Sequence, residues 1–486
     1  MDAGRRFAPY GRCSSGRPRS HTQRVSERAP RPSGSLLRVP TSITRRIWPA
    51  TWAGRGIAIT VALMVLAMLV PAVFGWHVHA LGNAPLSAGW RPRFGAGTLP
   101  AVAVGVATLR WAARLAGSLS WLRFLLASFV LGVAWLTSLA TVDGWRGIGG
   151  VLGRSDEYLP TARQVTDISA TLHEFVQRIP STSVGNWPTH VAGHPPGALL
   201  FFVLLVRLGL GGGLAAGWVV LVLAATTPGA VLITLRQLGA EGAARCGAPF
   251  LVVGPAAIWL AVSADAMFGA VAAWGLCCLA AAATTRNAVR MVGLSVLAGL
   301  LLGYCCFLSY GLPLLAVLTL AVLFVARNPR PILGTAIGGS AVVAAFAVNG
   351  FVWWRAFPVL RERYYAGIAS IRPAAYWVWG DLAALAFSAG PLVGASVAVA
   401  VARAREVRTG DVTTRPVITL TLAACTCIVL ADLSFMSKSE TDRIWLPFVP
   451  WLLLSAALLP ERWRRRALAG QVVLAIALQT LLFSRW

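Results

Sequence analysis

Residues 189–202 read THVAGHPPGALLFF, and in this stretch His190 and His194 stand directly before an apolar run. The run begins at Pro195 and ends at Arg207, well short of the roughly 20 residues that a membrane-crossing helix needs. It is therefore either a shortened membrane helix or a segment that does not cross. Each alternative gives the chain a different topology, and the charges elsewhere in the sequence distinguish them.

The composition is that of an integral membrane protein. The chain has 486 residues, of which 57% are hydrophobic and only 12% charged, and its mean hydropathy is +0.69. Soluble domains carry about 25% charged residues. The net charge of +26 does not indicate nucleic-acid binding, because most of it lies in short loops and one terminal tail. The eight cysteines show no metal-ligand spacing.

Apart from the run at 195–209, thirteen apolar runs are of membrane-crossing length. They lie near residues 57–75, 99–116, 122–142, 213–235, 247–262, 265–284, 291–308, 311–326, 332–352, 379–402, 416–433, 443–460 and 467–484. They predict an all-α polytopic protein with about 13 transmembrane helices. Residues 1–56 contain 12 arginines and no apolar run, so we expect a disordered cytoplasmic tail before a single transmembrane domain at 57–486.

The arginine distribution decides the topology, because cytoplasmic loops carry an excess of Lys and Arg. If the N-terminus is inside and 195–209 does not cross, the inside holds 29 basic and 6 acidic residues, and the outside 14 and 11. If 195–209 crosses, every Arg cluster from Arg236 onward moves outside. We therefore expect a half-helix at the outer membrane face, started by Pro195-Pro196. The outer loops are then 143–212, 353–378 and 434–443.

Three carboxylates in the largest outer loop are candidate catalytic bases. Asp143 lies where the third apolar run ends, and Asp156 and Glu157 follow directly before Tyr158. A partly desolvated carboxylate at a membrane edge can act as a general base on a hydroxyl group. The alternative is a structural carboxylate that caps a helix or pairs with a neighbouring arginine.

Further charged residues stand at the outer ends of later runs. Asp265 begins one of them, as a functional ionisable group or as a helix N-cap. Glu440 and Arg443 precede another, where an arginine fork suits a phosphate oxygen; alternatively Arg443 snorkels or pairs with Asp442. Arg372 lies in an aromatic-rich loop and could hold phosphate or belong to an interfacial belt.

The spacing of His190 and His194 would suit a metal on a helix, but Gly193 and the prolines argue against a helix across both. No HExxH pattern and no third ligand accompanies them. We therefore expect no metal here, and hydrogen bonds from the histidines to a phosphate or an acceptor instead.

In this order, the features resemble the GT-C superfamily of polytopic glycosyltransferases, which includes protein O-mannosyltransferases and aminoarabinose transferases. The similarity covers about 57–460 and is greatest to actinobacterial integral membrane proteins of this type. It rests on short motifs: VDGW (142–145), EYL (157–159), THVAGHPPG (189–197), SYGLP (309–313) and DRIWLP (442–447).

The resemblance implies a polyprenyl-phosphate sugar donor. It makes Asp143 or Glu157 the catalytic base, His194 a ligand of the lipid phosphate or the acceptor, and Arg443 a phosphate ligand. Two additional runs precede the acidic loop and the usual Asp-Glu pair near the first span is missing, so Asp156-Glu157 is an alternative counterpart. Tyr158, His190, Asp265, Arg372 and Glu440 complete the candidate substrate-binding set.

We therefore expect an inverting hexosyl- or pentosyltransferase in the plasma membrane. It would act on the extracytoplasmic face upon a cell-envelope glycan, lipid or protein, with membrane lipid but no nucleic acid as a partner. No cofactor is expected; a divalent metal is compatible with the chemistry, but nothing indicates one. The alternatives are a transporter or flippase of lipid-linked glycans, with ionisable groups near mid-membrane, and a non-catalytic membrane protein of an envelope complex.

Overall fold

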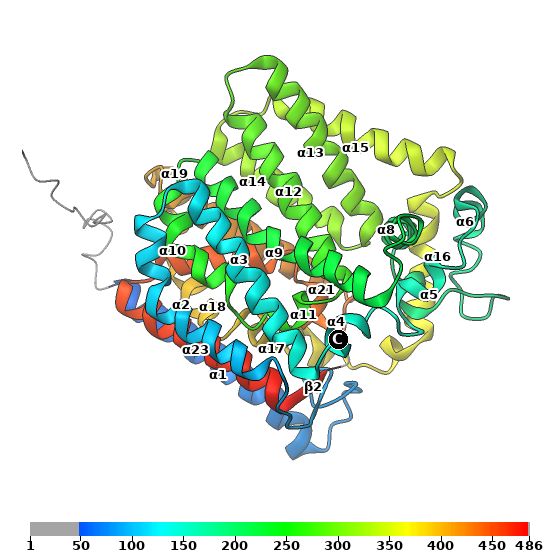
Figure 1. Ribbon diagram of the computed structural model, residues 1–486, viewed down its shortest axis with the longest axis horizontal. Coiled ribbons are helices and arrows are strands. Elements are labelled where there is room, and N and C mark those ends of the chain that lie inside the picture. The colour runs from blue at the N-terminus through cyan, green and yellow to red at the C-terminus, as the bar shows by residue number, and fades with distance from the viewer. Residues whose placement is uncertain (1–47, 485–486) are drawn as a thin grey trace, which may run out of the picture. The chain divides into compact units, whose positions relative to one another are not determined.

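The computed structural model describes residues 48–484, which are mostly helical (Figure 1). In this part of the chain, eight helices are long and apolar enough to cross a membrane: α1 (Trp48–Phe74), α2 (Thr98–Ser118), α3 (Trp121–Ala140), α9 (Gly213–Gln237), α12 (Ala264–Thr284), α13 (Ala288–Leu308), α15 (Pro331–Val348) and α20 (Thr414–Leu433). The pair α17 (Ala374–Ala389) and α18 (Leu392–Ala402) passes the same test but is bent by 107°. The predicted all-α polytopic membrane fold is confirmed.

The predicted number of thirteen crossings is not confirmed, because several apolar runs form short or interrupted helices. Proline lacks an N–H and clashes with the preceding turn, so it interrupts a helix. Gly254-Pro255 separates α10 (Glu241–Val252) from α11 (Ala257–Leu260), and Pro447 lies between α21 (Thr441–Ile444) and α22 (Val449–Leu453). The remaining short segments are η3 (Leu312–Leu314), α14 (Leu315–Ala326) and η5 (Leu454–Leu458). α23 (Glu461–Leu481) is an unbroken helix of 21 residues, but it begins with a run of charged residues and is not among the helices apolar enough to cross.

Short elements fill the connections between these helices. In the segments predicted to lie outside they are η2 (Thr141–Asp143), α4 (Arg146–Gly149), α5 (Tyr158–Ala162), α6 (Ile168–Glu174), α7 (Thr189–Gly193), α8 (Pro196–Arg207), α16 (Trp353–Ala366) and η4 (Ile368–Ser370). The connection after α18 contains α19 (Glu406–Thr409). The strands β1 (Ala88–Trp90) and β2 (Leu482–Ser484) pair antiparallel.

Contacts between segments that are distant in sequence show which helix ends lie at the same end of the bundle. At one end of the bundle β1 pairs with β2, and Arg93 Nε lies 2.6 Å from Asp143 Oδ1, just after α3. At the opposite end Arg245 donates to the carbonyl of Ala116, in the last turn of α2, and to that of Leu119, just after α2. The start and the end of α3 therefore lie at opposite ends of the bundle, as expected of a membrane-crossing helix.

Both ends of α8 belong to the same end of the bundle. The Tyr304 hydroxyl, in the last turn of α13, donates to the Gly197 carbonyl at 2.8 Å. At the other end of α8, Arg207 donates to the Thr166 carbonyl at 3.2 Å. Figure 1 shows α8 near α5, α6 and α16. Pro196 occupies the first turn, where a missing N–H costs no helical hydrogen bond.

The start of the first helix differs from the prediction. α1 begins at Trp48, so the last residues of the predicted tail are helical. The other residues of the predicted disordered tail, 1–47, lie outside the described residues. α1 packs on α18, where Gly56 lies so close to the Gly394 carbonyl that no side chain fits between the two helices.

Candidate functional site

The segment that joins α20 to α21 has an unusual backbone held in place by buried side chains. Ser439 and Glu440 are consecutive non-glycine residues with φ of 73° and 64°. Such conformations cost of order 1–3 kcal/mol and persist only where the surroundings enforce them. Asp381 Oδ1 accepts from the Ser439 N–H at 2.8 Å, and the Tyr364 hydroxyl accepts from the Lys438 N–H at 2.9 Å. The segment therefore has a fixed shape. Residues held in such rare backbone conformations occur mostly at functional sites.

This segment delivers Arg443 into a buried ion-pair network. The Arg443 side chain is 7% exposed; its Nη1 lies 2.7 Å from Asp265 Oδ2 and its Nη2 3.2 Å from Glu440 Oε2. Burial alone would lower the pKa of Arg443, but Asp265 and Glu440 raise it, so the guanidinium stays charged. Ser263, not Asp265, caps α12. Asp265 is therefore placed to pair with Arg443 from the first turn of α12.

Arg372 and Lys438 form a second buried cationic pair. Arg372 Nη1 donates to the Lys438 carbonyl at 2.6 Å, and Lys438 Nζ donates back to the Arg372 carbonyl at 3.2 Å. Arg372 Nη2 lies 3.7 Å from Glu440 Oε1 and has no hydrogen-bond acceptor in the part of the chain that the structure describes. Arg372 is 4% exposed and Lys438 9%. Burying a cationic donor without an acceptor costs folding free energy. We therefore expect a ligand to supply the missing acceptor.

A carboxylate and an imidazole meet beside this network. Glu157 Oε1 lies 2.9 Å from His190 Nδ1, with both side chains less than 10% exposed. The Tyr158 ring stacks on Phe202 at 5.2 Å between centroids, and its buried hydroxyl has no hydrogen-bond partner among the described residues. Burial raises the pKa of Tyr158, and the charges of Asp265 and Glu157 raise it further. This tyrosine is therefore neutral.

His194 is neutral and has a defined tautomer. Its Nδ1 lies 2.9 Å from the His190 carbonyl, and because a carbonyl only accepts, Nδ1 carries the proton. Burial lowers the pKa of His194. Nε2 therefore presents a lone pair. This favours contact with a hydroxyl group over contact with a phosphate oxygen, the other role expected from the resemblance.

Asp442 is a buried carboxyl group at the edge of the same network. It is 2% exposed, and its Oδ1 has no hydrogen-bond partner. Burial, followed by the charge of Glu440, raises the pKa of Asp442 to about 7. We call Glu157, Tyr158, His190, His194, Asp265, Arg372, Lys438, Glu440, Asp442 and Arg443 the polar cluster.

The raised pKa of Asp442 predicts how stability depends on pH. The folded protein holds a proton that the unfolded chain releases near pKa 3.8. Its free energy of unfolding therefore decreases as pH rises from 3.8 to about 7. Asp442→Asn, which mimics the protonated group, is expected to weaken this slope in thermal unfolding measured across that range. Glu362→Gln, at an exposed position on α16, is the control; equal slopes in both variants contradict the prediction.

Two of the predicted bases have other partners. Asp143 pairs with Arg93, and the Gln479 amide lies 3.4 Å from its carboxylate. Asp156 pairs with Arg154 at 2.8 Å, with both side chains about one-third exposed. The structural alternative therefore accounts for these two carboxylates, whereas Glu157 lies beside His190 and within electrostatic reach of Arg443. The other predicted substrate-binding residues all belong to the polar cluster.

Sequence reasoning missed Asp381, Lys438 and Asp442 as members or supports of this site. Asp381 carried a usable signal, because an ionisable residue inside an apolar run is rare without a function. Lys438 is the single lysine among the 43 basic residues. This makes it unusual in composition but does not indicate a role. For Asp442 the sequence indicates only a pairing with Arg443.

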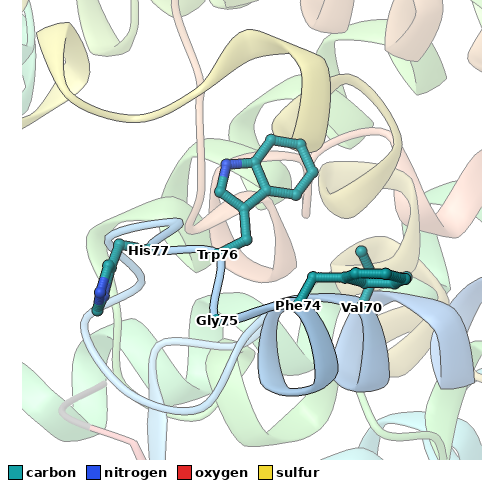
Figure 2. Close-up of a pocket in the computed structure, with 5 residues that line it drawn as sticks. All are labelled: Val70, Phe74, Gly75, Trp76 and His77. Atoms are coloured by element: carbon teal, nitrogen blue, oxygen red, sulfur yellow. The ribbon is translucent and has the colours of Figure 1, made fainter.

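One hollow in the described part of the chain shares no residue with this site. About 660 Å³ in volume, it is lined by Val70, Phe74, Gly75, Trp76 and His77 at the end of α1, where Figure 2 shows Phe74 and Trp76 bordering it. This hollow is open and mostly apolar, and no member of the polar cluster lines it. We therefore place the candidate site at the polar cluster, where buried polar atoms lack hydrogen-bond partners. Within residues 48–484 no group of three His, Cys, Asp or Glu side chains could hold a metal ion.

No family model, curated protein or solved structure matches this chain. The functional conclusion therefore depends on the chemistry of the polar cluster and on the motifs of the sequence.

Proposed function

We propose that this chain is a membrane glycosyltransferase that moves a sugar from a polyprenyl phosphate to a cell-envelope acceptor. The observation that carries the proposal is a set of buried polar atoms, in and beside the polar cluster, that make no hydrogen bond. Within residues 48–484, the buried atoms Arg372 Nη2, Tyr158 Oη, Asp442 Oδ1 and Trp445 Nε1 make no hydrogen bond, and Arg372 Nη2 has only the longer ion-pair contact with Glu440 at 3.7 Å. Buried polar groups are nearly always paired in proteins, so a group of unpaired ones marks a place where a polar ligand or water binds.

The proposal includes a membrane topology. The thirteen apolar segments cross the plasma membrane, some as interrupted helices, with the N-terminus inside and the polar cluster on the extracytoplasmic face. The arginine distribution supports this orientation, and the contacts at both ends of α8 support a half-helix that enters and leaves the same face. A short apolar helix of this kind is tolerated where protein or water covers its ends.

In this proposal the departing phosphate binds at Arg372 and Lys438. Arg443 is less suited to the phosphate because Asp265 and Glu440 already contact both of its terminal nitrogens. Arg372 Nη2 has an unused donor, and Lys438 adds a second positive charge. Preorganised cations stabilise the negative charge that accumulates as the sugar–phosphate bond breaks. Arg443 then holds the two carboxylates in position.

Glu157 is the proposed base. A second hydroxyl of the acceptor donates to the Nε2 lone pair of His194 and orients the acceptor. The attacking hydroxyl forms the new bond to the anomeric carbon and transfers its proton to Glu157. The bond from the anomeric carbon to the phosphate oxygen breaks, and its electron pair leaves with the polyprenyl phosphate. A single displacement inverts the anomeric configuration. His190, 2.9 Å from Glu157, fixes the carboxylate and stabilises its charge.

The role of Arg372 gives a direct test. Membranes or purified protein are supplied with radiolabelled polyprenyl-phosphate sugars, and Arg372→Gln is compared with wild type. Loss of one charge-assisted hydrogen bond is expected to reduce kcat/KM about 10- to 100-fold. Arg355→Gln, an exposed arginine on α16, is the matched control and is expected to keep wild-type kinetics. Wild-type transfer by folded Arg372→Gln would remove this residue from the site, and no transfer by the wild type from any such donor would overturn the proposed function.

A transporter of lipid-linked glycans is the second candidate, and one observation favours it. Helix breaks at Gly254-Pro255 and Gly390-Pro391 meet at Gln471, whose Nε2 donates to the Ala389 carbonyl at 3.0 Å. A small cavity of about 30 Å³ adjoins them. Transporters place binding sites at such broken helices. Lipid-linked glycan movement across vesicles that contain the purified protein, without sugar transfer, would establish this alternative.

A further inference from the structure

Two arginines come together at the end of the bundle opposite the polar cluster. Arg327 terminates α14, with its N–H directed to the Phe324 carbonyl at 3.2 Å. Arg415, in the first turn of α20, donates Nη2 to the same carbonyl at 3.0 Å. Its guanidinium also lies over the Phe324 ring, 4.9 Å from the centroid. One carbonyl of α14 therefore anchors both arginines.

The two positive charges lie close together at a partly buried position. Arg415 is 9% exposed, and its Nε has no hydrogen-bond partner among residues 48–484. The two guanidinium groups repel each other electrostatically. Asp411, the acidic residue four positions before Arg415, directs one carboxylate oxygen to the backbone and hydroxyl groups of Thr413 and Thr414. In the described part of the chain, neither arginine has a carboxylate within ion-pair distance.

The surface beside the pair is apolar. Leu320 and Phe324, one turn apart on α14, are 57% and 48% exposed. Exposed apolar side chains on a membrane helix face lipid chains. An apolar strip that ends at two arginines matches one kind of molecule, a lipid with acyl chains and an anionic headgroup.

We infer that Arg327 and Arg415 bind the phosphate group of an anionic phospholipid whose acyl chains lie along Leu320 and Phe324. A charge-assisted contact between a guanidinium and a phosphate oxygen satisfies the buried Nε. The inference is independent of the proposed function, because the site lies at the other end of the bundle and takes no part in sugar transfer.

Native mass spectrometry of the purified full-length chain tests this inference. Protein is titrated with phosphatidylglycerol or with phosphatidylcholine in neutral detergent, and a parallel arm adds inorganic phosphate. Wild type is expected to retain phosphatidylglycerol preferentially, and Arg327→Ala and Arg415→Gln are expected to lose about fivefold in affinity each. Arg327 is exposed, so its substitution leaves the fold intact.

The matched control is Arg290→Ala, which removes an exposed arginine near the same end of the bundle, at the start of α13. It is expected to bind phosphatidylglycerol like wild type. Equal losses of phosphatidylglycerol affinity in Arg290→Ala and Arg327→Ala would show that binding depends on the total positive charge of this end and not on a specific site. That result would overturn the inference. Binding of inorganic phosphate to this pair without a preference for phosphatidylglycerol would overturn the lipid assignment.

Discussion

Arg443→Met is expected to be the most destabilising substitution considered. The change leaves Asp265 buried without the cation that lies 2.7 Å from it, and it removes the Arg443 contact of Glu440 at 3.2 Å. Removing one partner of a buried ion pair costs about 3–5 kcal/mol, because the remaining charge has neither water nor a counter-ion. The measurement is chemical or thermal unfolding of purified protein in detergent, where the transition of the variant should shift strongly towards milder conditions.

Two comparisons separate this effect from simple loss of an arginine. Arg154→Met breaks the ion pair with Asp156, in which both side chains are about one-third exposed, and is expected to cost at most about 1 kcal/mol. In the double variant Arg443→Met/Asp265→Leu, the buried carboxylate is also removed, and part of the lost stability should return. A single variant as stable as Arg154→Met would contradict the buried network.

The charge and hydropathy patterns were sufficient to predict the fold class. Charged side chains are costly inside a membrane, so long runs without them indicate membrane-crossing helices. The apolar runs predicted the long helices, and the loop boundaries at 143–212 and 353–378 lie within a few residues of the helix ends. The interruptions within 247–262 and 443–460 were harder to foresee. Proline marks where a helix can break, but packing decides whether it bends or stops.

The candidate site could be predicted only in part, since ion pairs form between residues that are far apart in sequence. Arg443 and Asp265 are separated by 178 positions, and nothing in the sequence specifies that pairing. Arg93 likewise gave no sign that it would meet Asp143. The motifs did indicate which residues to examine, because Glu157, His190 and His194 lie in short polar stretches beside apolar helices.

Glu157→Gln is expected to reduce the rate of sugar transfer by about 10²- to 10⁴-fold, the usual contribution of a general base. Glutamine has the same shape and still offers an oxygen to His190, but it cannot take a proton from the acceptor. Binding of the polyprenyl-phosphate donor should remain, since the phosphate contacts come from Arg372 and Lys438. Single-turnover transfer from a radiolabelled donor measures the rate, and equilibrium binding of the same donor measures the affinity.

Asp143→Asn and Asp156→Asn are the matched controls, because each removes one carboxylate charge from the same loop. Their carboxylates face Arg93 and Arg154, so both variants are expected to transfer sugar within about tenfold of wild type, with changes that follow stability and not chemistry. The reverse pattern, with Asp143→Asn inactive and Glu157→Gln fully active, would assign the base to the end of α3. In that case the pairing of Asp143 with Arg93 would have to open when substrate binds, and the buried pair of Glu157 and His190 would be structural.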